Sequence, residues 1–206
     1  MNRLLFTLLL FLLCSQNSLA EVFIVTNTSP TGAGSLRDAI EKAAANGTRE
    51  TDYIHFNISR AGNLNIRIAL SDLLPALTSN IVIDGTTQPG TAMGVSAAKI
   101  GVSLEGFTST TNDLYLFDAR SATDIKIYGL FLKGNVIDRN TLSMPLRMFG
   151  IYLGGSHNIE IGAPSKGNVI SGWSTAIYDE ANDRYGPPSS SIKIAANFFG
   201  LDVDGK

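Results

Sequence analysis

An internal repeat constrains the fold of this 206-residue chain more than any other feature. An isoleucine, a charged residue and a second isoleucine occupy residues 125–127, 159–161 and 192–194, at offsets of 34 and 33 residues. Periods of 20 to 50 residues are typical of solenoid proteins. Because side chains alternate between the two faces of a strand, both isoleucines of a triplet point inward and the charged residue points outward. The repeat predicts equivalent strands stacked over an apolar interior.

Two more segments recur in the same part of the chain. Residues 133–137 recur unchanged as residues 166–170 at an offset of 33, which makes Asn135 and Asn168 equivalent and predicts a side-chain ladder between them. Residues 150–152 match residues 176–178 at an offset of only 26. Three matched elements in one order predict three short strands per repeat, joined by loops of variable length.

Stacking like strands of successive repeats gives a parallel β-helix, a single-stranded solenoid with three strands per coil. The loops of variable length are residues 138–148 and 181–190. Upstream, residues 81–85 and 102–106 resemble one strand and turn seen twice, 21 residues apart, the length of a minimal coil. We therefore expect an all-β fold with coils over residues 61–206, incomplete at the C-terminus because no capping segment follows.

Turn-forming residues bound each of the short apolar segments, which is typical of strands. The expected strands are residues 22–26, 53–58, 64–69, 81–83, 100–104, 114–117, 125–132, 150–153, 158–161, 169–170, 176–178 and 192–194. One helix is expected over residues 36–45, where apolar residues recur with helical spacing after the N-cap Ser35 and a variant capping box with Asp38. Residues 21–60 then form an N-terminal cap of strand, helix and strand.

The first 20 residues have the pattern of a secretory signal peptide. Arg3 precedes an apolar run from Leu4 to Cys14, and Ser18 and Ala20 are the small residues of a cleavage site before Glu21. The run is too short to span a membrane as a helix. We expect an exported protein, secreted or at the cell surface, whose mature part has no membrane span.

Composition narrows the class of partner. The mature part carries 15 Lys and Arg against 18 Asp and Glu, a net charge of −3, and no basic cluster. Nucleic acid is therefore an unexpected partner, and a polysaccharide or cell-surface glycan is the partner that we expect.

Several segments resemble secreted bacterial right-handed parallel β-helix repeat proteins. Residues 25–28, 34–40 and 54–56 resemble their N-terminal module, with Asp38 where Glu is usual, and residues 81–90, 167–172 and 197–202 resemble the segments that follow. The resemblance implies a right-handed parallel β-helix of the pectate-lyase-like kind, with the helix as its N-terminal cap. It does not select a function, because this fold carries lyases, hydrolases, adhesins and stalks.

Candidate metal ligands are few. The match of residues 81–85 to 102–106 places Asp84 and Glu105 one coil apart, where their carboxylates would hold Ca²⁺ or act as acid and base. The simpler interpretation is that both precede glycine in turns. His55 and His157 lack the spacing of a zinc site, and no other cofactor is expected.

Variable loops on a rigid scaffold tend to carry function. The second loop and its approach hold the candidate ligand-binding residues Trp173, Asp179, Asp183, Arg184 and Tyr185, where an aromatic ring beside mixed charges suits a sugar; a solvated loop explains them equally well.

Three functions follow from these observations. The first is an exported structural, adhesive or carbohydrate-contacting β-helix module without evident catalysis. The second is a polysaccharide lyase or hydrolase, for which the resemblance implies a base such as Arg139 or Arg147 facing Asp84 or Glu105. The third is an N-terminal fragment of a longer surface protein.

Overall fold

Three parallel β-sheets form the framework of the protein. The computed structural model describes residues 19–59, 66–93, 98–99, 102–105, 114–134, 147–181 and 187–201. The six-stranded sheet has the order β1 (Val22–Val25), β2 (Asp52–Phe56), β4 (Ile81–Asp84), β9 (Thr123–Tyr128), β12 (His157–Ile161) and β15 (Ser190–Ile194). The five-stranded sheet has the order β3 (Ile66–Ala69), β7 (Val102–Glu105), β10 (Leu130–Lys133), β13 (Val169–Ser171) and β16 (Phe198–Phe199). The three-stranded sheet has the order β8 (Leu114–Asp118), β11 (Met148–Leu153) and β14 (Thr175–Asp179).

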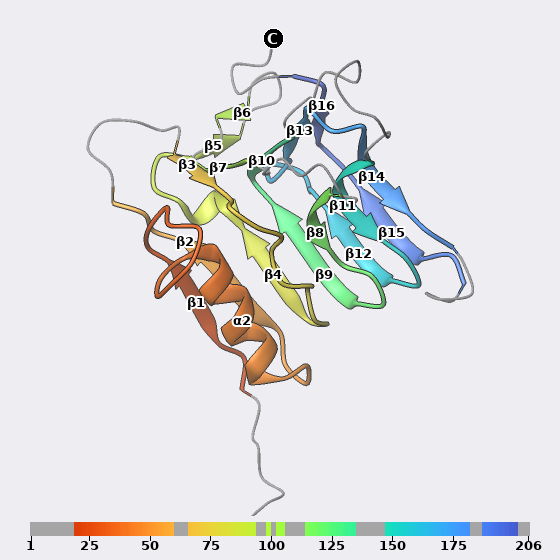
Figure 1. Ribbon diagram of the computed structural model, residues 1–206, viewed down its shortest axis with the longest axis horizontal. Coiled ribbons are helices and arrows are strands. Elements are labelled where there is room, and N and C mark those ends of the chain that lie inside the picture. Colours follow the sequence, from red (N-terminus) through yellow and green to blue (C-terminus); the bar gives the residue numbers. More distant parts are fainter. Residues whose placement is uncertain are drawn as a thin grey trace, which may run out of the picture.

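The chain visits these sheets in a fixed rotation. From β7 to β15 it passes through the five-stranded, the three-stranded and the six-stranded sheet three times in that order (Figure 1). A short antiparallel pair, β5 (Ala92–Met93) and β6 (Ala98–Lys99), and a 3₁₀ turn, η1 (Gly85–Thr87), interrupt the path between β4 and β7. The expected β-rich architecture with parallel strands is confirmed.

The isoleucine triplets are in register, as the repeat predicts. Ile159 is opposite Ile125 on one side and Ile192 on the other, and Glu160 is opposite Lys126 and Lys193. Ile125 and Ile159 are at most 1% exposed. Glu160 forms an ion pair with Lys193 at 3.0 Å, so the middle residues of the triplets contact each other outside the core.

Left-handed backbone forms a column at the start of this sheet. Asn80, Asp124, Asn158 and Ser191 all have φ between 54° and 62°, and each immediately precedes the first inward isoleucine of its strand. Asn and Asp adopt this conformation at lower cost than β-branched residues. A polar residue therefore adopts the left-handed conformation at the start of β4, β9, β12 and β15.

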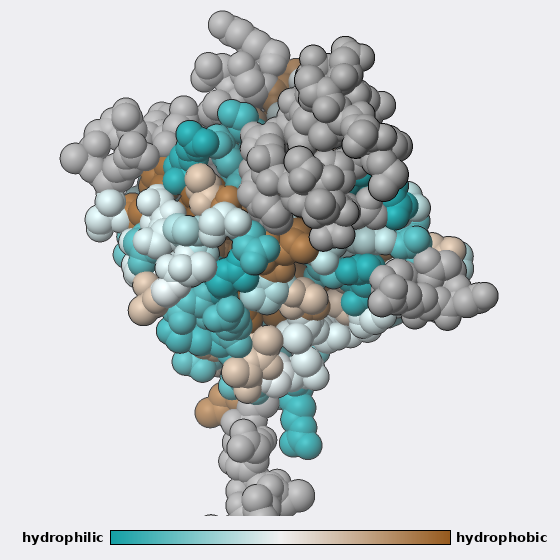
Figure 2. Space-filling view, in the orientation of Figure 1, coloured by the Kyte–Doolittle hydropathy of each residue, from teal (hydrophilic) through white to brown (hydrophobic). Residues whose placement is uncertain are grey.

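The single helix in the described part of the chain, α2 (Leu36–Asn46), ends one residue later than expected. The Ser35 side chain accepts a hydrogen bond from the Asp38 backbone N–H at 3.2 Å, and Asp38 accepts one from the backbone N–H of Gly34. The apolar face, which includes Leu36 and Ile40, is buried against β1 and β2. Hydrophilic residues cover the opposite face (Figure 2).

Two register predictions are wrong. The expected strand 125–132 is two strands on different sheets, because Gly129 turns the chain at a φ of 63°. Lys133 and Lys166 are not equivalent, because Lys133 ends β10 opposite Ser171, whereas Lys166 lies before β13. The first residue of the repeated pentapeptide therefore has a different place in each copy.

The side-chain ladder uses a different pair from the one expected. The Asn168 side chain accepts from the Leu130 backbone N–H at 3.1 Å and donates to the Ile127 carbonyl at 2.9 Å and to Asn197 Oδ1 at 3.0 Å. Asn197 in turn donates to the Ile161 carbonyl at 2.6 Å. The ladder therefore joins Asn168 to Asn197, while Asn135 lies outside the described residues.

Candidate functional site

Four aromatic rings lie side by side on the three-stranded sheet. Phe149 stacks on Tyr178 with ring centroids 4.5 Å apart and an angle of 8° between the ring planes. The Tyr152 ring lies 5.0 Å from Phe149, 5.6 Å from Tyr178 and 5.7 Å from Tyr115. These separations are within the range of favourable aromatic pairs, each worth about 0.5–1.5 kcal/mol beyond burial. We call Tyr115, Phe149, Tyr152 and Tyr178 the ring row.

The register of the sheet explains the row. Tyr115 is opposite Phe149, and Tyr152 is opposite Tyr178, so rings from β8, β11 and β14 meet at neighbouring positions. Ile151 and Leu153, on either side of Tyr152, belong to the hydrophobic core. The ring of Tyr152 is therefore directed away from that core, and the row marks the outer face of the sheet.

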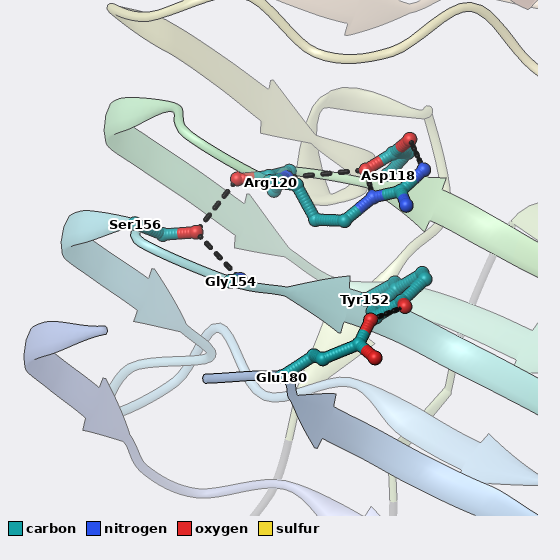
Figure 3. A network of polar contacts seen from close by, with 7 residues as sticks. Asp118, Arg120, Tyr152, Gly154, Ser156 and Glu180 are labelled. Carbon is teal, nitrogen blue, oxygen red and sulfur yellow. Dashed lines mark hydrogen bonds and ion pairs between the residues drawn. The ribbon is translucent and has the colours of Figure 1, made fainter. Parts of the chain in front are cut away.

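Arg120 lies over one end of the ring row. Its guanidinium carbon is 4.3 Å from the Tyr152 ring centroid and 5.3 Å from that of Tyr115. Asp118 accepts hydrogen bonds from the backbone N–H and from Nε of Arg120 at 3.1 and 2.8 Å, and a further one from Nη2 (Figure 3). A carboxylate held in this bidentate way fixes the guanidinium plane, so the arginine side chain is held in one orientation over the rings.

Carboxylate and hydroxyl groups complete this end of the site. The Tyr152 hydroxyl donates to Glu180, the residue after β14 (Figure 3). Ser156 is 1% exposed; its hydroxyl donates to the Ala119 carbonyl at 2.8 Å and accepts from the Gly154 backbone N–H at 3.2 Å. The turns that carry Arg120 and Ser156 are thereby tied together.

Arg147 lies over the other end of the row. Its guanidinium carbon is 5.5 Å from the Phe149 ring centroid and 6.0 Å from that of Tyr178. Arg147 is exposed, Tyr115, Tyr178 and Glu180 are half-buried, and Phe149 and Tyr152 are only 2% and 4% exposed. The two buried rings therefore support the more exposed groups around them.

Trp173 is not part of the ring row. Its indole N–H donates to the Leu132 carbonyl at 3.0 Å, and the ring packs against the hydrophobic core. Its atoms come within 2.7 Å of the point where a Cβ on Gly134 would lie. The half-buried ring also lies next to Gly150 of β11, so it contacts both the five-stranded and the three-stranded sheet, and its expected contact with a sugar stays a prediction.

Asp179 closes the base of the second loop. Its carboxylate accepts from the Ser189 hydroxyl at 2.6 Å and from the Ser189 backbone N–H at 3.2 Å. The remaining expected loop residues, Asp183, Arg184 and Tyr185, and the expected base Arg139 lie outside the described residues.

The expected stack of Asp84 on Glu105 does not form. Asp84 ends β4 in the six-stranded sheet, opposite His55 and Tyr128, whereas Glu105 ends β7 in the five-stranded sheet. The 21-residue spacing is therefore a step from one sheet to the next and not a complete coil.

Each of these carboxylates has a cationic partner. Asp84 pairs with Lys166 at 2.6 Å, and Glu105 pairs with Lys133 at 3.4 Å and with Arg67. Among the described residues no three His, Cys, Asp or Glu side chains are placed to hold a metal ion. His157 contacts the Ser190 hydroxyl at 2.8 Å, and His55 contacts the Tyr53 ring.

Tyr128 is opposite Asp84 in the six-stranded sheet and lies close to its partner Lys166. Lys166 Nζ lies 5.2 Å from the centroid of its ring. Burial, together with the negative charge and hydrogen bond of Glu160 and the charge of Asp84, raises the pKa of Tyr128 to about 12. The phenol therefore stays protonated and serves as a hydrogen-bond donor on the six-stranded sheet.

Sequence reasoning did not identify the ring row as a site, although one signal was present. The match of residues 150–152 to 176–178 pairs Tyr152 with Tyr178, as the register confirms. Nothing in the sequence places Arg120, on a short turn, over those rings.

Comparison with protein-family models and with curated protein sequences finds no match to this chain. No helix in the described part of the chain is long and apolar enough to cross a membrane.

Proposed function

We propose that the chain is an exported right-handed parallel β-helix, capped by α2, whose three-stranded sheet binds polysaccharide through the ring row. The fixed rotation of the chain through three parallel sheets supports the β-helix. The polar outer face and apolar inner face of α2 support its role as a cap, because the end of a solenoid needs a polar surface.

The ring row with an arginine at each end is the observation that carries the proposed binding. A sugar ring presents apolar C–H faces and hydroxyl groups at its edge. Tyr115 and Tyr178 supply aromatic surface, while Arg120, Arg147 and Glu180 supply donors and acceptors around it. Strands of one sheet are about 4.8 Å apart, so a row across three strands suits an extended, repeating ligand.

The proposal is one of binding, without catalysis. Among the described residues, the groups expected of a lyase do not converge, since Arg147 lies beside the three-stranded sheet, and Asp84 and Glu105 lie on the other two. Ion pairs with lysine also neutralise both carboxylates.

A calorimetric screen of the processed chain against acidic and neutral polysaccharides, with and without Ca²⁺, tests the proposal. Binding without Ca²⁺, and without the ultraviolet absorbance of an unsaturated product, is the expected result. Ca²⁺-dependent binding with rising absorbance would make the protein a lyase. If a folded sample gives no binding signal with any of the polysaccharides, the proposed binding is ruled out.

A further inference from the structure

Asp52 is a buried carboxylate held only by neutral donors in the described part of the chain. It is the first residue of β2 and is 1% exposed. Its Oδ1 accepts from the backbone N–H of Glu21 at 2.9 Å and from the Asn46 side chain at 2.8 Å. No lysine, arginine or histidine among the described residues forms an ion pair with it. A buried charge without a counter-ion is costly.

The backbone nitrogen of Glu21, which donates to Asp52, is part of the peptide bond at the expected cleavage site. Ala20 and Glu21 are exposed, and Leu19 is 71% exposed, so a peptidase has access to this bond. Asn46, at the end of α2, also donates to the Leu19 carbonyl at 2.7 Å. The helix end and β2 thus hold the chain on both sides of the site.

We propose that Asp52 is already positioned to form an ion pair with a new N-terminus. That N-terminus is the α-ammonium group of Glu21, which is created when the bond between Ala20 and Glu21 is cleaved. The reaction is hydrolysis by a peptidase. Water adds to the Ala20 carbonyl, the bond between its carbon and the Glu21 nitrogen breaks, and Ala20 leaves with a carboxylate. The Glu21 nitrogen leaves as an amine and is protonated at neutral pH, because an α-amino group has an ordinary pKa of about 8.

Before cleavage a neutral backbone N–H donates to the Asp52 carboxylate, and after cleavage the donor at the same position carries a positive charge. The charge adds a Coulombic attraction at hydrogen-bond distance from the carboxylate, in a buried place where such an attraction is weakly screened. The new ion pair fastens β1 to β2 and to the end of α2, the elements that close this end of the core. The mature region is consequently less stable before cleavage than after it, which favours an export-competent precursor. This inference rests on the export proposed above and not on carbohydrate binding.

A double-mutant cycle tests the ion pair between Asp52 and the new N-terminus. The free energy of unfolding is measured for chains that begin at Glu21 or at Ala20, each with Asp52 and with Asp52→Asn. We expect the chain that begins at Glu21 to have an unfolding equilibrium constant at least about tenfold smaller than that of the Ala20 chain when Asp52 is present. The difference disappears in Asp52→Asn. Equal effects in both backgrounds, or no effect in either, would overturn the proposal.

Two controls separate this role from a purely structural one. Glu50→Gln removes an exposed acid two residues before Asp52 and leaves the tenfold difference intact. Acetylation of the Glu21 amine removes the charge while Asp52 is unchanged, and we expect it to abolish the gain even if Asp52→Asn does not fold. The mass of the exported chain shows whether processing leaves Glu21 first; another first residue would overturn the proposal while leaving the carbohydrate test unaffected.

Discussion

The guanidinium carbon of Arg120 lies 4.3 Å from the centroid of the Tyr152 ring, while Nε and Nη2 of the same guanidinium donate to Asp118. The arginine is thus a bridge between an acid on its own turn and a ring on the next strand. Its side chain is only 18% exposed, so the contact is partly desolvated and stronger than one at the surface.

A double-mutant cycle measures this contact. Arg120→Leu and Tyr152→Leu, alone and together, are expected to show a coupling of about 1 kcal/mol in the free energy of unfolding, the size of a partly desolvated cation–π contact. Urea titrations of the four proteins give the value. Additive effects would mean that the guanidinium and the ring are neighbours without an interaction.

Asn168 is the most sensitive polar residue of the interior. It is 0% exposed, and its amide joins Leu130, Ile127 and Asn197. Asn168→Ala leaves buried backbone groups without partners, at about 1–3 kcal/mol for each unsatisfied group. We expect a loss of about 2–4 kcal/mol in the free energy of unfolding, against less than about 0.5 kcal/mol for the exposed Asn57→Ala.

Trp173→Phe separates a structural from a binding role. The substitution removes the hydrogen bond to the Leu132 carbonyl and keeps an aromatic ring, so we expect a loss of about 1 kcal/mol in stability. Polysaccharide affinity, measured by calorimetry, stays within about twofold. A large loss of affinity at unchanged stability would restore the tryptophan to the binding site.

Ionisation of Tyr128 lowers the stability of the folded protein at alkaline pH. Its pKa rises from 10.0 to about 12 in the folded state. The contribution to stability is fully present below pH 10 and is lost as the pH rises toward 12, because the unfolded chain releases the proton first. Stability of the wild type should fall more steeply over this range than that of Tyr128→Phe. Parallel curves would show that Tyr128 titrates normally.

The register of the six-stranded sheet was predictable because inward isoleucines must recur at equal positions of each of its repeated strands, and Ile125, Ile159 and Ile192 do so. The helix was predictable from Ser35 and the spacing of Leu36 and Ile40. Both features depend on local pattern and burial alone.

The failures come from residues whose letters repeat in different surroundings. Lys133 and Lys166 begin identical pentapeptides, yet one ends a strand and the other precedes one. Asp84 and Glu105 each end a strand, but the two strands belong to different sheets. The ring row could not be predicted for another reason, since contacts such as that of Arg120 with Tyr152 arise only when strands far apart in the sequence pair in one sheet.

The most direct test of binding through the ring row is a comparison of two variants, Tyr178→Ala and Tyr53→Ala. The quantity compared is their affinity for the polysaccharide found in the calorimetric screen. Both tyrosines are partly exposed, but Tyr178 belongs to the ring row and Tyr53 lies on the six-stranded sheet. The account predicts a loss of at least about tenfold, or 1.4 kcal/mol, for Tyr178→Ala and less than about twofold for Tyr53→Ala. Equal affinities for both variants and the wild type would contradict it.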